Sequence, residues 1–243
     1  YEFTEEQKKP QYIVLNPSAF EKRESKIVER SEENIAETEI DMDIEPADKI
    51  ETVKGAVFGT VMHRCFELIV NEWKENFEIS DDEIKSIVNS AICQAVIEEL
   101  DKIPADKVNA YKAELNKMAE GFINDCEIIN AVKNAEAVYT ELPFSFFAEG
   151  EEAINLMKDL NLEKYTSSKV WINGIADMVI KNHDGSIIIA DYKSDERKDY
   201  SREKFKKILN ERYKGQLALY KYAVGKVMGA EPGSIKCMIC NYR

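Results

Sequence analysis

The sequence predicts a mixed α/β (α+β) fold, with a central mixed β-sheet flanked by helices and preceded by a helical region. Apolar residues recur at helical spacing through residues 52–133, and β-branched and aromatic runs typical of strands follow up to residue 193. A further helix and strand come next, an order typical of helices packed on one sheet. We expect a single domain over residues 52–243, with residues 1–51 as an arm and acidic linker packed on it.

Composition limits the classes of protein that this chain can be. The 243 residues are 44% hydrophobic, which suits a globular chain long enough for one large core. There is no apolar run near the roughly 20 residues that cross a bilayer and no basic-then-apolar leader, so we expect no membrane partner and a cytoplasmic location. Cys65, Cys93 and Cys126 lie in apolar helical patterns, where buried free thiols would suit a reducing cytosol.

The charged residues are unevenly distributed. A formal net charge of −13 opposes binding of a polyanion at long range. Residues 29–51 hold ten acidic against two basic residues, whereas residues 193–214 hold nine basic against five acidic residues. The basic stretch directly follows the candidate site residues described below, and the acidic stretch is remote from them in sequence.

Three helices are expected before residue 133. The first opens at Gly59 or Thr60. The second starts at Ser80, which is followed by Glu83 three residues later in the pattern of a capping box. After Pro104, a third helix is expected from about Asp106 to Ile129.

Strand signals dominate the next part of the chain. The Asp184-Gly185 pair favours a hairpin turn at 182–185, residues 151–165 form a short helix or a loop, and Gly229 ends an amphipathic helix over 212–228. The expected strands are 137–147, 169–181, 186–193 and 235–242.

Charged residues stand near the ends of the two hairpin strands. Asp191 and Lys193 are two residues apart on a strand, so their side chains project from the same face. Hard cations such as Mg²⁺ prefer carboxylates, water and substrate phosphate, and a nearby lysine can position or deprotonate a metal-bound water. A salt bridge at a strand edge gives the same pattern and is the alternative.

Asp177 and His63 extend the candidate site. Asp177 lies in an apolar strand, where a lone carboxylate is costly to bury unless it is paired or binds a metal; a satisfied structural aspartate is the alternative. His63 and Glu67 are four residues apart on the first helix and share a face. His63 can be a metal ligand, more suited to Mn²⁺ than to Mg²⁺, or a structural histidine.

Two further patterns lie near the C-terminal end of the sequence. Tyr213, Gln216 and Tyr220 share one side of the last long helix, where they could contact phosphates or stack on single-stranded bases, or simply line the rim of the helix. Cys237 and Cys240 form the sequence's only C-x-x-C. Without a second pair at ligand spacing, a strand with buried thiols is favoured over a zinc site.

Five short motifs occur in a fixed order along the chain. They are G-T-x-x-H-x-x-x-E (59–67), E-L-P-F (141–144), G-I-A-D (174–177), D-Y-K-S-D (191–195) and Y-x-x-Q-L-x-x-Y (213–220). This set resembles the RecB-like nucleases of the PD-(D/E)XK superfamily, most of all the C-terminal nuclease domain of bacterial AddA and RecB helicase-nuclease subunits. N-P-S-A-F-E (16–21) is similar to the entry segment of those domains. The resemblance spans about residues 12–243 and implies a restriction-endonuclease-like core.

The resemblance also implies roles for particular residues. His63, Asp177 and Asp191 would bind Mg²⁺ (or Mn²⁺) with the backbone carbonyl of Tyr192, and Lys193 would be the catalytic lysine. Asp177, Asp191 and Gln216 would serve catalysis with Lys193, and the remaining family positions would bind or position DNA: Glu67, Glu141, Tyr213, Gln216 and Tyr220. Some members carry an iron–sulfur cluster on one upstream and three C-terminal cysteines. Because only Cys237 and Cys240 lie near the end of this sequence, no cluster is expected.

The implied function is a metal-dependent DNA exonuclease. It would digest single-stranded DNA delivered by a helicase domain or subunit during double-strand-break repair and recombination. The sequence contains no G-x-x-x-x-G-K-[ST], so any helicase motor is expected elsewhere. Two alternatives stay open: a non-catalytic DNA-binding or scaffold module of the same fold, and a standalone phage or mobile-element exonuclease.

Overall fold

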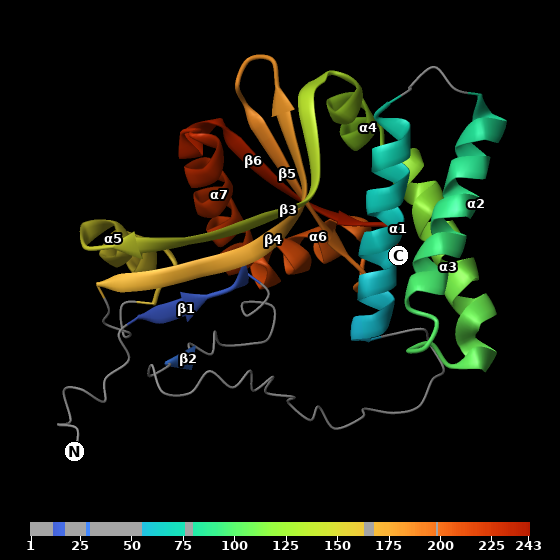
Figure 1. Cartoon of the computed structure of the whole chain (residues 1–243), viewed down its shortest axis with the longest axis horizontal. Helices are drawn as coiled ribbons and strands as arrows, with labels where there is room; N and C mark the ends of the chain where they lie inside the picture. The colour runs from blue at the N-terminus through green and yellow to red at the C-terminus, as the bar shows by residue number, and fades with distance from the viewer. Residues whose placement is uncertain (1–11, 18–27, 30–54, 76–79, 163–167, 198) are drawn as a thin grey trace. The chain divides into compact units, whose positions relative to one another are not determined.

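A computed structural model of the chain describes residues 12–17, 28–29, 55–75, 80–162, 168–197 and 199–243 (Figure 1). Most of the predicted arm and acidic linker, and residues 18–21 of the entry motif, lie outside these described residues. The chain forms two compact units. The first comprises Tyr1–Glu51, Pro143–Gly174 and Tyr213–Leu219, and the second comprises Thr52–Leu142, Ile175–Arg212 and Tyr220–Arg243.

After two short strands that were not predicted, the described elements follow the predicted order of helices, strands, helix and strand. The helices are α1 (Ala56–Trp73), α2 (Asp81–Glu98), η2 (Ala105–Lys107), α3 (Val108–Ile123), α4 (Cys126–Lys133), α5 (Glu151–Asp159), α6 (Arg202–Arg212), α7 (Lys214–Met228) and η3 (Pro232–Ser234). The strands are β1 (Ile13–Leu15), β2 (Val28–Glu29), β3 (Ala135–Glu149), β4 (Lys169–Asn182), β5 (Ile187–Lys193) and β6 (Ile235–Asn241).

The sheet is mixed, and β4 runs through both units. In the first unit, β1 pairs antiparallel with β2 and parallel with β4. In the second unit, β4 pairs antiparallel with β5, and β5 pairs parallel with β6. The hydrogen-bonded order is therefore β2-β1-β4-β5-β6, with β3 also paired to β4. The predicted class, a mixed α/β fold with a central mixed sheet flanked by helices, is confirmed.

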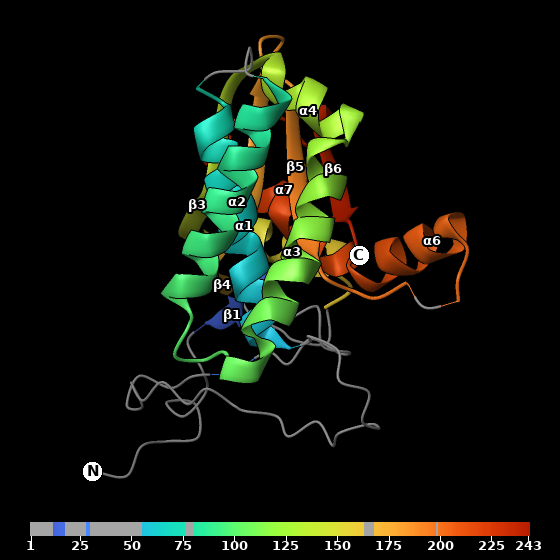
Figure 2. The same ribbon diagram turned by 90° about the vertical axis from the view of Figure 1, so that its right-hand side faces the viewer.

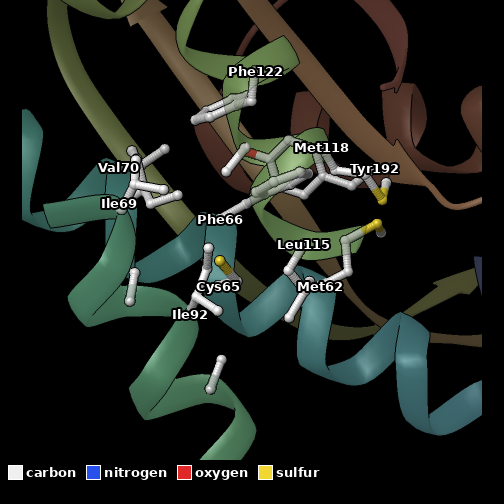
Figure 3. Close-up of a cluster of buried hydrophobic side chains, with 14 of the residues drawn as sticks. Met62, Cys65, Phe66, Ile69, Val70, Ile92, Leu115, Met118, Phe122 and Tyr192 are labelled. Atoms are coloured by element: carbon white, nitrogen blue, oxygen red, sulfur yellow. The ribbon is translucent and has the colours of Figure 1, made fainter. Parts of the chain in front are cut away.

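The core of the second unit joins a helical layer to one face of its strands. Helices α1, α2 and α3 lie side by side in both views (Figures 1 and 2). Phe66 of α1 stacks on Phe122 of α3, with ring centroids 4.9 Å apart, and both rings meet Tyr192 of β5 edge-on (Figure 3). Met178, Ala190 and other strand residues with the same alternation belong to this cluster. The helical layer therefore fixes β4 and β5 from one side.

Several predicted boundaries change in the structure. The helix expected to open at Gly59 or Thr60 begins at Ala56, because Gly55 supplies the turn before it with φ 111°. No capping side chain marks this start in the sequence. The capping box of Ser80 and Glu83 is confirmed at the start of α2. The single helix expected over 106–129 is split into α3 and α4. Asp125 starts the second helix by accepting bonds from the N–H groups of Glu127 and Ile128.

Two further expectations are wrong. Cys93 and Cys126 are exposed rather than buried, whereas Cys65 is buried as expected. The helix predicted over 212–228 begins at Lys214, and α6 precedes it within the basic stretch. The single pair Phe205 and Leu209 supplies the buried stripe of α6. Among the described residues, no helix is long and apolar enough to cross a bilayer.

We expect Phe122→Ala to lower the free energy of unfolding by roughly 3–5 kcal/mol, because it leaves a cavity where α1, α3 and β5 meet. Urea denaturation followed by circular dichroism measures this loss. Ile97→Ala is the matched control, since Ile97 is 66% exposed on α2 and its truncation should change stability by no more than roughly 0.5 kcal/mol. Equal losses in the two variants would contradict a core centred on Phe122.

Candidate functional site

Buried polar side chains are few in the described part of the chain, and they coincide with predicted site residues. They are Asp177, Asp191, Lys193 and Gln216. The first three belong to the β4–β5 hairpin in the second unit, and Gln216 lies on α7 in the first unit. Buried charges are costly unless they are paired or bind a metal.

The geometry of the hairpin brings Asp177 and Asp191 together. Gly185, with φ 81°, closes the turn, and Met178 pairs with Ala190 in the ladder. Asp177 and Asp191 are the next residues beyond this pair, so they lie on adjacent strands of the hairpin. Strand alternation turns Asp191 and Lys193 away from the face on which Ala190 and Tyr192 pack against the helices. The predicted hairpin thus concentrates two carboxylates and one ammonium in one place.

Lys193 is held by Asp191. Its Nζ lies 3.1 Å from Oδ1 and 3.0 Å from Oδ2 of that carboxylate, and both side chains are buried. Burial and then repulsion by Asp177 raise the pKa of Asp191 to about 7, although Lys193 opposes the shift. Asp177 has a partner of its own, because the backbone N–H of Tyr192 donates to its Oδ2 at 2.7 Å.

His63 reaches this cluster from α1. Its Nδ1 lies 3.4 Å from Oδ1 of Asp177 and 3.9 Å from Oε1 of Glu141, and its ring meets that of Tyr192 edge-on. Burial disfavours the charged imidazole, but Asp177, then Glu141 and Asp191, outweigh burial and raise the pKa of His63 to about 9. The predicted proximity of His63 and Asp177 is therefore present in the structure.

Glu141 enters the site from β3 through an unusual backbone. Its φ is 47°, in the left-handed region that side-chain-bearing residues rarely occupy and that costs of order 1–3 kcal/mol. Its Oε1 is buried and has no hydrogen-bond partner among the described residues. Burial, then repulsion by Asp177, raises the pKa of Glu141 to about 7. The family resemblance implies only a DNA-positioning role for Glu141, and no sequence pattern marks its closeness to His63 and Asp177.

These residues fit a divalent cation. His63, Glu141 and Asp177 each offer a ligand atom, and the three atoms lie within 4.8 Å of one another. The Glu141 carboxylate is available as a ligand, because its Oε1 accepts no hydrogen bond from the described residues. Carboxylate oxygens together with an imidazole nitrogen suit Mn²⁺ and Mg²⁺. Asp191 stands outside this group and faces Lys193. Its predicted role as a ligand, like that of the Tyr192 carbonyl, stays a prediction.

The remaining candidate residues differ in their surroundings. Glu67 pairs with Arg64 at 2.8 Å, and the pair lies on the same helix as His63. Tyr213 and Gln216 are buried in the first unit, and Tyr220 is buried in the second. Buried side chains cannot stack on a base from solvent, so their burial favours positioning over base contact. Cys237 and Cys240 lie three apart on β6, on opposite faces of the strand.

Comparisons with known proteins identify the family of the chain. Residues 12–242 match the family model of the PD-(D/E)XK nuclease superfamily. The chain is also similar to bacterial proteins named as the A subunits of ATP-dependent helicase/nucleases. The protein of Limosilactobacillus reuteri is 30% identical over 176 residues, that of Clostridium novyi 26% over 183, and that of Enterococcus faecalis 26% over 194. These matches cover 70–80% of the chain but only 11–14% of the relatives' lengths.

We expect divalent-cation binding to tighten as the pH rises from about 6 to about 9, because a cation must displace protons from its ligands. The pKa of Glu141 is about 7 and that of His63 about 9, so the proton competition weakens in two steps over this range. Calorimetric titration with Mn²⁺ at several pH values measures the affinity.

The two histidines of the chain provide a matched pair for this measurement. His63→Gln should remove the upper part of the pH dependence, whereas His183→Gln should leave it unchanged, because His183 is exposed in the hairpin turn. A Mn²⁺ affinity that does not vary with pH in the unsubstituted protein would rule out this group as the binding site.

Proposed function

Because the chain belongs to the PD-(D/E)XK nuclease superfamily, we propose that it is a metal-dependent deoxyribonuclease that hydrolyses phosphodiester bonds. One observation carries the proposal: His63, Glu141 and Asp177 converge beside the buried pair of Asp191 and Lys193. A module that only binds DNA has no use for carboxylates buried against one another, since their repulsion destabilises the fold.

The chemistry divides between a cation and the side chains of the hairpin. His63, Glu141 and Asp177 would hold Mg²⁺ or Mn²⁺, with Asp191 and the Tyr192 carbonyl as further proposed ligands. Such an ion supplies positive charge for the phosphate and lowers the pKa of a bound water. Lys193, fixed by Asp191, positions the attacking water and stabilises charge on the phosphate oxygens. The water oxygen bonds to phosphorus, the bond to the sugar oxygen breaks, and a proton passes to that leaving oxygen.

Helix α6 is the proposed DNA surface beside this site. Phe205 and Leu209 bury one side of it, while Lys204, Lys206 and Lys207 are exposed. The helix ends near the site, since Arg212 pairs with Asp195, two residues after Lys193. Exposed lysines neutralise phosphates without reading sequence.

An exposed aromatic beside α6 favours a single strand. Tyr200 is 42% exposed, and Lys204 Nζ lies 4.9 Å from the centre of its ring. An unpaired base can stack on such a ring, whereas a base within a duplex cannot. We therefore propose single-stranded DNA as the substrate.

The relatives suggest the biological setting. They are named as parts of ATP-dependent helicase/nucleases, and this chain corresponds to a small part of their length. We propose that a helicase domain or subunit delivers the strand, and that the nuclease acts as an exonuclease in double-strand-break repair and recombination. All five cysteines are free, which suits the proposed cytoplasmic location.

Cleavage of labelled single-stranded DNA should require a divalent cation and should fall about 10²- to 10³-fold in Lys193→Met, which keeps the buried stem but removes the charge. Gel assays with Mg²⁺, Mn²⁺ or EDTA measure this. Lys117→Met, at an exposed position on α3, should cleave normally. Activity that survives EDTA, or full activity in Lys193→Met, would refute the mechanism, and no cleavage of any DNA would favour the non-catalytic binding module.

A double substitution on α6 tests the DNA surface. Lys206→Ala with Lys207→Ala should weaken single-stranded DNA binding and reduce the salt dependence of binding, by about one unit of the log–log slope for each phosphate that is no longer neutralised. The turnover rate at saturating DNA should not change. Fluorescence anisotropy at several salt concentrations measures the slope. Lys85→Ala, 71% exposed on α2, is the control, and an equal slope in both variants would place the DNA elsewhere.

A further inference from the structure

The chain segment after Lys193 is held by the side chains of Asn241 and Arg243. Strand β5 ends at Lys193, so the carbonyl groups that follow leave the sheet ladder. Asn241 Nδ2 donates to the carbonyl oxygens of both Lys193 and Asp195, at 2.9 Å in each case. Arg243 Nη1 donates to the carbonyl oxygen between them, that of Ser194, at 3.2 Å. Three consecutive carbonyls are thus bound by two side chains.

Asn241 is itself fixed in orientation. It pairs with Lys193 in the parallel β5–β6 ladder, which sets its place beside the lysine. The backbone N–H of Arg243 donates to Asn241 Oδ1 at 3.4 Å, so the amide oxygen and amide nitrogen have distinct partners. An amide with both ends in use cannot flip without losing these bonds.

Arg243 ties the same segment to the helical layer. Its Nε lies 2.9 Å from Oε1 of Glu114 on α3, and its guanidinium lies 5.3 Å from the centre of the Phe58 ring on α1. The Arg243 side chain is only 8% exposed. The planar fork of arginine can serve the carboxylate and the Ser194 carbonyl together, which a lysine ammonium cannot reproduce.

We propose that Asn241 and Arg243 are positioning residues that hold the backbone of Lys193–Asp195 and thereby fix the Lys193 ammonium against Asp191. The proposal rests on the role of Lys193 in the proposed function. The lysine ammonium sits at the end of a flexible four-carbon stem, so its place depends on a fixed backbone. Displacement of a reacting group by about 1 Å can lower the rate about 10²-fold. The contacts of Asn241 and Arg243 with the carbonyls of residues 193–195, here called the clamp, therefore matter for turnover.

Steady-state kinetics on single-stranded DNA tests the proposal in the full chain. Asn241→Ala should lower kcat roughly 10- to 100-fold, the usual effect of removing a residue that orients a catalytic group, while KM for DNA and the affinity for Mn²⁺ stay unchanged. Asn116→Ala, which removes an amide bonded to Glu120 on α3, is the matched control. Arg243→Lys separates the contact with Glu114 from the contact with the Ser194 carbonyl. This variant should keep its thermal stability through the ion pair with Glu114, but its kcat should still fall.

A second measurement does not depend on activity. Lys193 is 6% exposed, so it should resist acetylation by an amine-reactive reagent, and mass spectrometry should show faster labelling of Lys193 in Asn241→Ala at unchanged labelling of Lys117. Normal kcat together with unchanged labelling of Lys193 would overturn the clamp. If the unsubstituted protein cleaves no DNA, the proposed function fails, and the labelling result alone still supports or overturns the positioning of Lys193.

Discussion

The main physical constraint on this structure is the confinement of several carboxylates in a small, poorly solvated space. Asp177 and Asp191 lie on adjacent strands of a tight hairpin and repel each other, and Glu141 approaches from β3. The positive groups Lys193 and His63 lie beside these carboxylates. Repulsion between the carboxylates opposes folding, and it is expressed as raised pKa values of Asp191 and Glu141. The packing of α1–α4 on the strands must outweigh this repulsion. The negative potential of these carboxylates, which destabilises the fold, would also attract a cation to the site.

Tyr192 connects the packing to the chemistry. Its ring is buried and packs edge-on against the stacked rings of Phe66 and Phe122, and its backbone N–H donates to Asp177. Its neighbours in sequence, Asp191 and Lys193, project to the other face of the strand. The hydrophobic layer therefore fixes the position of β5, and β5 in turn places Asp191 and Lys193. A rigid strand places such groups better than a loop would.

Local chemistry explains which features the sequence could predict. The Ser80 capping box, the turn at Gly185 and the two strands that flank this turn are each encoded within a few residues, and the structure follows them. Hydrophobic periodicity could not predict two of the helices. Asp125 starts α4 where the apolar pattern continues from α3, and α6 buries only Phe205 and Leu209.

For the site, the order of the motifs grouped His63 with Asp177, and the two side chains lie 3.4 Å apart. The nearness of Glu141, and the contacts that Asn241 and Arg243 make after β5, depend on tertiary placement of strands far apart in sequence. The left-handed backbone at Glu141 has a consequence for design. Glycine would occupy that conformation without strain, so a sequence optimised for thermal stability alone would discard the carboxylate there. Glu141 should therefore be kept unchanged when stabilised variants are designed, because thermal stability and cation affinity place opposite demands on this residue.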